Sequence, residues 1–91
     1  MNREEFEADL LREGYRVTYA GLRANEALPE HGHDFDVRIL VIGGEITLTR
    51  DGKAETYRLG ESCSLTANAR HAEQAGPQGV AFVVGRRAVK A

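Results

Sequence analysis

The sequence has 91 residues, enough for one hydrophobic core and too few for two, so residues 1–91 are expected to form a single domain. Apolar residues make up 42%, too many for a disordered chain, and no apolar run approaches the roughly 20 residues of a membrane-spanning helix. With 12 basic and 14 acidic side chains the formal charge is −2, and the sequence lacks the basic stripe with interleaved aromatics of nucleic-acid-binding proteins.

Two further features bound the class of protein. Cys63 is the single cysteine, which excludes a disulfide scaffold. The N-terminus is acidic and amphipathic, unlike a signal peptide. We therefore expect a cytoplasmic domain with no nucleic-acid partner and no membrane partner.

The first 13 residues predict a short α-helix. Asn2 is a typical N-cap, because its side-chain oxygen can accept a hydrogen bond from a free backbone N–H of the first turn. Gly14 is a typical residue just after a helix end. Between them, apolar residues at helical spacing form one stripe: Phe6, Leu10 and Leu11.

Beyond Gly14 the helical period disappears, and apolar residues mostly alternate with polar ones, which predicts β-strands. Turn signals separate these strands: a loop at 25–30, glycines at 43–44 and 60, and turns at 51–52, 67–70 and 76–79. The Asp51-Gly52 pair is typical of a type I′ hairpin. Strands are expected over 15–20, 35–42, 46–49, 53–59, 63–65, 71–75 and 80–84.

About seven short strands with no interdomain linker indicate an all-β fold. Such a chain needs a closed or double-sheet arrangement, because long open edges promote aggregation. The pattern therefore predicts a small barrel or jelly roll with one N-terminal helix.

Three histidines are the candidates for chemistry. His31 and His33 form a His-x-His pair, and the period of a strand would put both rings on one face. Neutral imidazole binds zinc, iron, nickel and copper, and His71, at the start of another predicted strand, is the remaining histidine that could share such an ion. The alternative is a solvated pair at a loop edge, and the spacing alone does not decide between the two.

Two stretches of the chain resemble the motifs of the cupin family. Residues 25–45, NEALPEHGHDFDVRILVIGGE, resemble the first motif, G-x5-H-x-H-x3-E-x6-G, and residues 60–71, GESCSLTANARH, resemble the second, G-x5-P-x-G-x2-H-x3-N. Asn25 and Asn68 stand where the motifs have glycine, and asparagine tolerates the positive φ that such turns need.

The resemblance covers residues 15–85, nearly the whole chain outside the helix, and the barrel is expected over about 15–86. It implies a double-stranded β-helix (jelly-roll) barrel with a divalent transition metal in its mouth, held by the histidines that match the motifs: His31, His33 and His71. Within the family, such sites host oxygenases, isomerases, decarboxylases and non-enzymatic sensors. Iron, manganese, nickel, zinc and copper are not distinguished by the sequence.

The chain departs from the cupin motif at the carboxylate. Val37 occupies the position of the motif's glutamate, and valine cannot bind a metal. Asp36 is adjacent, but strand alternation puts it on the opposite face beside Arg38, which favours an exposed ion pair over a metal-binding role. Glu73 follows His71 by two residues and points the same way along a regular strand. It is a candidate fourth ligand, a partner that orients a histidine, or a general acid or base, and the alternative is a solvated glutamate.

The two faces of the predicted strands have different roles. The face of the histidines is expected to continue as a pocket wall: Phe35, Val37, Ile39 and the hydroxyl of Tyr19. Leu40 and Ile42 point outward and must be covered by the helix or a second subunit, and we expect a homodimer that uses both. Cys63 is expected in the core, and the basic residues at 86–90 are expected to be a solvated tail.

These features predict a small metal-binding domain that binds or acts on a small organic, anionic molecule, since a three-histidine site carries the full charge of its ion. A cupin enzyme of this kind would be a dioxygenase or isomerase, but no residue is assigned as catalytic. The alternatives are a non-catalytic ligand-binding or sensor module, with or without metal, and a structural dimer with vestigial histidines. Fold resemblance does not choose among them.

Overall fold

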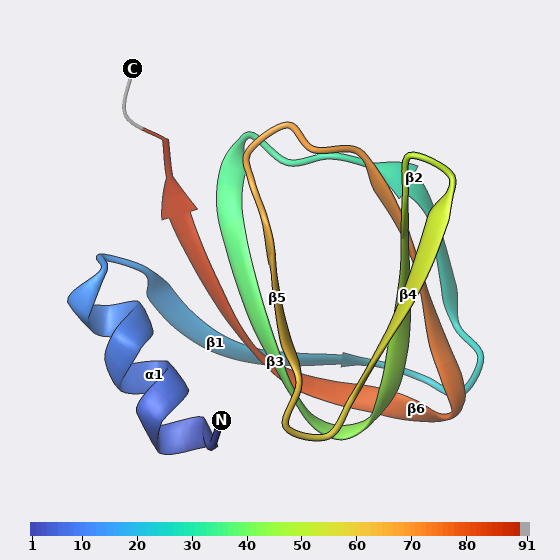
Figure 1. Ribbon diagram of the computed structural model, residues 1–91, viewed down its shortest axis with the longest axis horizontal. Helices are drawn as coiled ribbons and strands as arrows, with labels where there is room; N and C mark the ends of the chain where they lie inside the picture. The colour runs from blue at the N-terminus through green and yellow to red at the C-terminus, as the bar shows by residue number, and fades with distance from the viewer. Residues whose placement is uncertain (90–91) are drawn as a thin grey trace.

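The computed structural model describes residues 1–89, so the predicted solvated tail is described only as far as Val89 and Lys90 lies outside it. Within residues 1–89, one helix precedes six strands, and Figure 1 shows them in chain order. The elements are α1 (Arg3–Arg12), β1 (Arg16–Leu22), β2 (Ala27–His31), β3 (Phe35–Arg50), β4 (Lys53–Arg58), β5 (Ser62–Leu65) and β6 (His71–Ala88). The predicted all-β fold with a short N-terminal helix is confirmed. Across the described residues, no helix is long and apolar enough to span a membrane.

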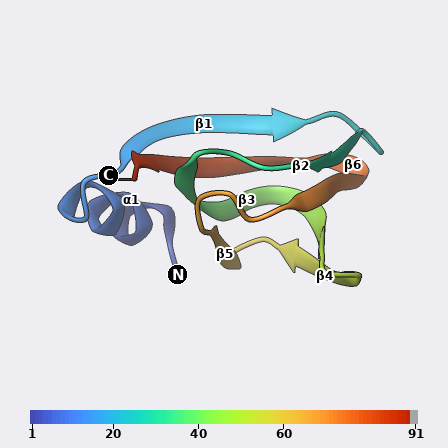
Figure 2. The same ribbon diagram turned by 90° about the horizontal axis from the view of Figure 1, so that it is seen from above.

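The strands pair antiparallel in the order β1-β6-β3-β4, with β2 added to β6 and β5 added to β3. The two long strands, β3 and β6, therefore take part in both halves of the barrel. In Figure 1 the strands β2 to β6 follow a closed outline, with α1 outside it, and Figure 2 shows β1 and β4 on opposite sides of the molecule. This is the jelly-roll arrangement expected from the sequence.

The strands β3 and β6 are longer than expected, because two predicted breaks are bulges. The ladder between them continues from the Gly44–Val80 pair to the Ile46–Ala75 pair, so it skips residue 45, which pairs with β4, on one strand and residues 76–79 on the other. Gly44 has φ +69°, and a Cβ there would lie 2.1 Å from the carbonyl oxygen of Gly79. The glycines allow a close crossing of two backbones, so both strands bend and continue instead of ending.

Other local predictions fare differently. Asp51 and Gly52 both have positive φ, as a type I′ hairpin requires, and so do Asn25 and Asn68, the residues at the motif glycines. The expected loop at 25–30 is wrong, because most of it is β2, which pairs with β6.

Two apolar clusters lie on opposite faces of the sheet formed by β1, β6 and β3. The inner cluster fills the barrel and includes Val37, Ile39 and Phe82, with Cys63 packed against it as expected. The outer cluster joins α1 to the sheet, and its members are Phe6, Leu10, Tyr15, Leu40 and Val83. The Asn2 side chain accepts the Glu5 N–H and caps this helix, as predicted.

The helix covers the outward side chains of β3 within one chain. Leu40 is fully buried beneath it. Leu11 was expected in the same apolar stripe as Phe6 and Leu10, but it is 65% exposed, so that expectation is wrong. A ten-residue helix docked through the i, i+4 pair leaves the next position on its free side. The homodimer stays a prediction.

Candidate functional site

The three histidines come together at one end of the barrel. His31 ends β2 and His71 begins β6, and the ladder between these strands sets the two residues opposite each other. His33 lies just after β2, outside any strand, and its carbonyl accepts the N–H of Asn68 at 2.6 Å. One ligand atom from each of the three side chains lies within 4.8 Å of the other two. The rings therefore meet although His33, unlike His31 and His71, does not occupy the strand position that the sequence predicted.

Two of the rings are held in a defined tautomer by the backbone. Nδ1 of His31 lies 2.7 Å from the carbonyl oxygen of Pro29, and Nδ1 of His71 lies 3.1 Å from that of Ala69. A carbonyl oxygen only accepts, so each Nδ1 carries the hydrogen, and Nε2 of the neutral ring has a free lone pair. His71 is 1% exposed, and its Nε2 has no hydrogen-bond partner among the described residues.

Burial and neighbouring imidazoles affect the third ring. Burial is the largest influence that lowers the pKa of His33, and the nearby rings of His31 and His71 lower it further. The ring of Phe35 stacks on that of His33, with centroids 4.9 Å apart. His33 is therefore neutral at neutral pH, the state in which imidazole binds a metal.

Glu73 lies with the histidines, and Asp36 does not. One carboxylate oxygen of Glu73, Oε2, lies 3.0 Å from Nε2 of His31 and 3.4 Å from Nε2 of His71. Asp36 faces the outside of the barrel, as strand alternation predicts, where it accepts the backbone N–H of Ala67 at 2.9 Å.

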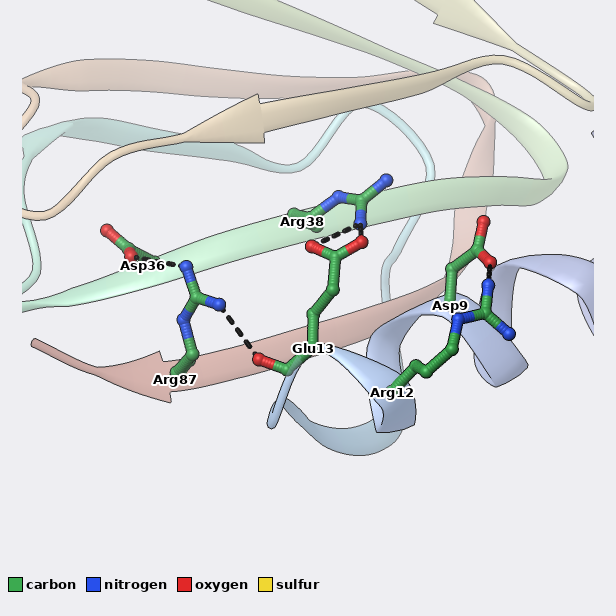
Figure 3. A network of polar contacts seen from close by, with 6 residues as sticks. All are labelled: Asp9, Arg12, Glu13, Asp36, Arg38 and Arg87. Atoms are coloured by element: carbon green, nitrogen blue, oxygen red, sulfur yellow. Dashed lines mark hydrogen bonds and ion pairs between the residues drawn. The ribbon is translucent and has the colours of Figure 1, made fainter.

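The outer polar network replaces the expected ion pair between Asp36 and Arg38. Arg87 donates to Asp36 and, at 2.8 Å, to the carbonyl oxygen of Glu13 at the end of α1, while Arg38 donates to the Glu13 carboxylate (Figure 3). The backbone hydrogen bond from Ala67 and then the guanidinium of Arg87 hold the pKa of Asp36 below its ordinary value. Asp36 thus stabilises the junction between helix and barrel.

A cavity of about 220 Å³ adjoins the histidines. Val37 and Ile39 line it as predicted, whereas Phe35 does not: its ring stacks on that of His33 instead. Tyr19 does not line it: its side chain is 54% exposed, and its hydroxyl donates to Glu7 of α1. The reason is strand parity, because Tyr19 pairs with Val83 of the outer cluster, whereas its neighbour Ala20 lines the cavity.

Sequence reasoning missed the basic residue at this cavity. Arg86, expected in a solvated tail, lines the cavity and donates from Nη1 to Oγ1 of Thr18 at 2.9 Å. It pairs in register with Val37 on β3, so both face the same side. The alternation of Phe82, Val84 and Arg86 along β6 was the signal that could have found it.

A scan against protein-family models finds no match for the chain, and a search of curated proteins finds none either. Solved structures do resemble it. A cupin superfamily protein from Desulfitobacterium hafniense DCB-2 has a TM-score of 0.72 at 17% identity, over 82% of this chain and 68% of that chain. An RmlC-like cupin from Shewanella frigidimarina NCIMB 400 has a TM-score of 0.72 at 16% identity, over 84% and 68%. The chain has the cupin fold.

A third similar structure is the Cupin_2 domain of an XRE family transcriptional regulator from Enterobacter cloacae. Its TM-score is 0.69 at 18% identity, over 84% of this chain and 83% of that chain. At these identities the likeness concerns the cupin fold and not the chemistry of the site.

The residues present in this cupin barrel fit a metal ion. The donor set is three imidazoles, and the two with defined tautomers have Nε2 lone pairs within 3.4 Å of one carboxylate oxygen. The buried Nε2 of His71, without a hydrogen-bond partner in residues 1–89, is the atom that a bound cation would satisfy. The cluster of His31, His33 and His71 can therefore hold a metal ion.

Proposed function

We propose that this chain is a small metal-binding cupin whose histidine cluster holds a divalent transition metal and whose cavity binds a small anionic organic molecule. The observation that carries the proposal is the convergence of His31, His33 and His71, with ligand atoms within 4.8 Å of one another. Backbone carbonyls fix the tautomers of two rings, so the lone pairs are in place before any ion binds.

The size and charge of the cavity support a small anion. A volume of about 220 Å³ corresponds to roughly seven water molecules at ~30 Å³ each, so the ligand has few heavy atoms. Neutral imidazoles do not compensate the charge of a divalent ion, the single carboxylate of Glu73 balances at most half of it, and the guanidinium of Arg86 lies on the same cavity. A carboxylate or enolate is therefore favoured over a cation.

The metal ion and the side chains around the histidine cluster would have different roles in ligand binding. A bound ion would supply Lewis acidity toward an oxygen of the ligand. An apolar wall keeps water from the ligand and consists of Leu65, Phe82 and Val84. Arg86, which donates a hydrogen bond to Thr18, orients the anionic group of the ligand.

A non-catalytic ligand-binding module is the second candidate. Two observations favour it: Val37 stands at the position of the motif's glutamate, and a domain of similar fold belongs to a transcriptional regulator. Such a module would bind the same kind of molecule without converting it.

Metal analysis tests the proposal. The protein is purified aerobically from unsupplemented medium, its metals are quantified, and binding of Zn²⁺ and Co²⁺ to the stripped protein is measured by calorimetry. We expect about one ion per chain, lost in His33→Ala and His71→Ala and retained in Gln74→Ala, an exposed control on β6. Substoichiometric metal that His33→Ala leaves unchanged would refute the metal site.

Turnover separates the two candidates. Oxygen uptake and product formation are measured with the loaded protein against a panel of small acids and diketones. Conversion that disappears in His71→Ala establishes an enzyme, whereas tight binding of a compound that is never consumed establishes a module.

A further inference from the structure

The site lacks the carboxylate of the cupin motif at its usual place and has another one elsewhere. Val37, at the motif position, is an apolar part of the cavity wall. Glu73 lies on β6 opposite Leu48 of β3 and Leu28 of β2, whereas Val37 lies opposite Leu65 and Arg86. The carboxylate therefore belongs to a different part of the wall from the one the motif uses.

The geometry around Glu73 brings together three atoms that one metal cation can bind. Nδ1–H of His31 and of His71 are both committed to backbone carbonyls, so each neutral ring presents a lone pair at Nε2. A carboxylate oxygen 3.0 Å and 3.4 Å from these two nitrogens is a third acceptor. One proton can bridge only one of the two pairs, but a single metal ion can bind all three atoms.

The two distances from Glu73 to the histidine nitrogens are those of neighbouring ligands on one ion. Two atoms each about 2.1 Å from a common metal are about 3.0 Å apart at 90° and about 3.4 Å apart at 109°. Oε2 of Glu73 lies 3.0 Å from one nitrogen and 3.4 Å from the other. The Glu73 side chain is 14% exposed, so bulk water solvates its negative charge poorly and a bound cation would compensate that charge.

We infer that Glu73 is the fourth protein ligand of the metal, a carboxylate moved from β3 to β6. This inference rests on the proposed metal site. The metal keeps a glutamate, while the side of the cavity at Val37 and Arg86 stays free for the anionic group of the organic ligand. The valine at the motif position then leaves room for the organic ligand, and the site keeps a complete set of metal ligands although the motif's glutamate is absent.

The test measures Co²⁺ binding to the stripped full-length protein by calorimetry and by its visible absorption spectrum, which reports coordination. Glu73→Gln keeps the shape and removes the charge, and Glu55→Gln on the exposed β4 is the matched control. We expect Glu73→Gln to bind Co²⁺ at least tenfold more weakly with a changed spectrum, and Glu55→Gln to match the wild type.

A second variant separates a ligand from a residue that only orients a histidine. The double variant Val37→Glu/Glu73→Gln returns the carboxylate to the motif position, where it can reach the ion but not the original partners of Glu73. Recovery of most of the affinity supports the inference. Unchanged Co²⁺ affinity and spectrum in Glu73→Gln, with binding abolished in His71→Ala, would overturn the inference and leave the proposed function standing. Loss of affinity in Glu73→Gln that the double variant does not recover assigns Glu73 an orienting role and also overturns it. Absence of binding in the wild type overturns both.

Discussion

Replacing His71 by leucine should stabilise the metal-free protein and abolish its response to metal. The side chain is 1% exposed, and its Nε2 is a buried polar atom without a hydrogen-bond partner among residues 1–89. Leucine fills a similar volume and has no polar atom to bury. Because the buried imidazole is costly to the metal-free fold, we expect its role to lie in the metal-bound state.

The magnitude follows from two opposing contributions. Removing an unsatisfied buried polar group is worth about 1–3 kcal/mol, and losing the hydrogen bond to the Ala69 carbonyl costs about 1 kcal/mol. The net gain is about 0–2 kcal/mol. A chain of this length has an unfolding entropy near 0.19 kcal/mol/K, so each kcal/mol shifts Tm by about 5 °C. His71→Leu should therefore melt up to about 10 °C above the wild type.

Metal should reverse this order. At a free concentration 100 times Kd, binding stabilises the wild type by about 2.7 kcal/mol, or about 14 °C, and His71→Leu not at all. Circular dichroism melts in EDTA and in Zn²⁺ measure both values. His33→Leu is the control, because its half-buried ring should lose the metal response without the metal-free gain. A His71→Leu protein that melts more than about 5 °C below the wild type in EDTA would refute the reasoning.

Three further predictions concern the barrel and its helix. A Cβ at Gly85 would lie 2.7 Å from Cδ2 of Leu10, so Gly85→Ala should lower the free energy of unfolding by about 1–3 kcal/mol. Leu10→Ala should lower it by about 2–5 kcal/mol, because it leaves a cavity. The double variant, measured by urea denaturation, should lose about 1–3 kcal/mol less than the sum of the two single variants. The lowered pKa of Asp36, caused mainly by the Ala67 N–H, means that its stabilisation is present above pH about 4 and is lost as the pH falls through the folded value. Asp36→Asn should therefore flatten the acid side of the stability profile, and an unchanged slope between pH 5 and 2 would contradict this. Burial raises the pKa of Cys63 to about 11, so its thiol should react with a disulfide reagent at pH 8 about 100-fold more slowly in the folded than in the unfolded protein, and equal rates would be the contrary result.

Local structure was largely predictable because it depends on residues close together in the chain. The Asn2 cap, the Asp51-Gly52 hairpin and the period-two strands each follow from the conformational preferences of a few neighbouring residues. The His-x-His pair and His71 could be identified as one candidate cluster for a different reason, the resemblance of their surroundings to cupin motifs, because the spacing alone did not decide. Alternation alone also placed Asp36 on the outside.

The sequence by itself thus determined the class of fold, the positions of most strands and the set of histidines. Only the tertiary structure decided what those histidines face. Where the backbones cross at Gly44 and Gly79, the two predicted turns are bulges in continuous strands. The sequence could not distinguish the two cases, because glycines favour both turns and bulges and only the opposing backbone decides between them. The approach of Glu73 to His31 depends on how β2 pairs with β6, a contact between residues 42 positions apart that no local pattern encodes. The chemistry of the site is therefore a property of strand register, since register decides which side chains share one small volume.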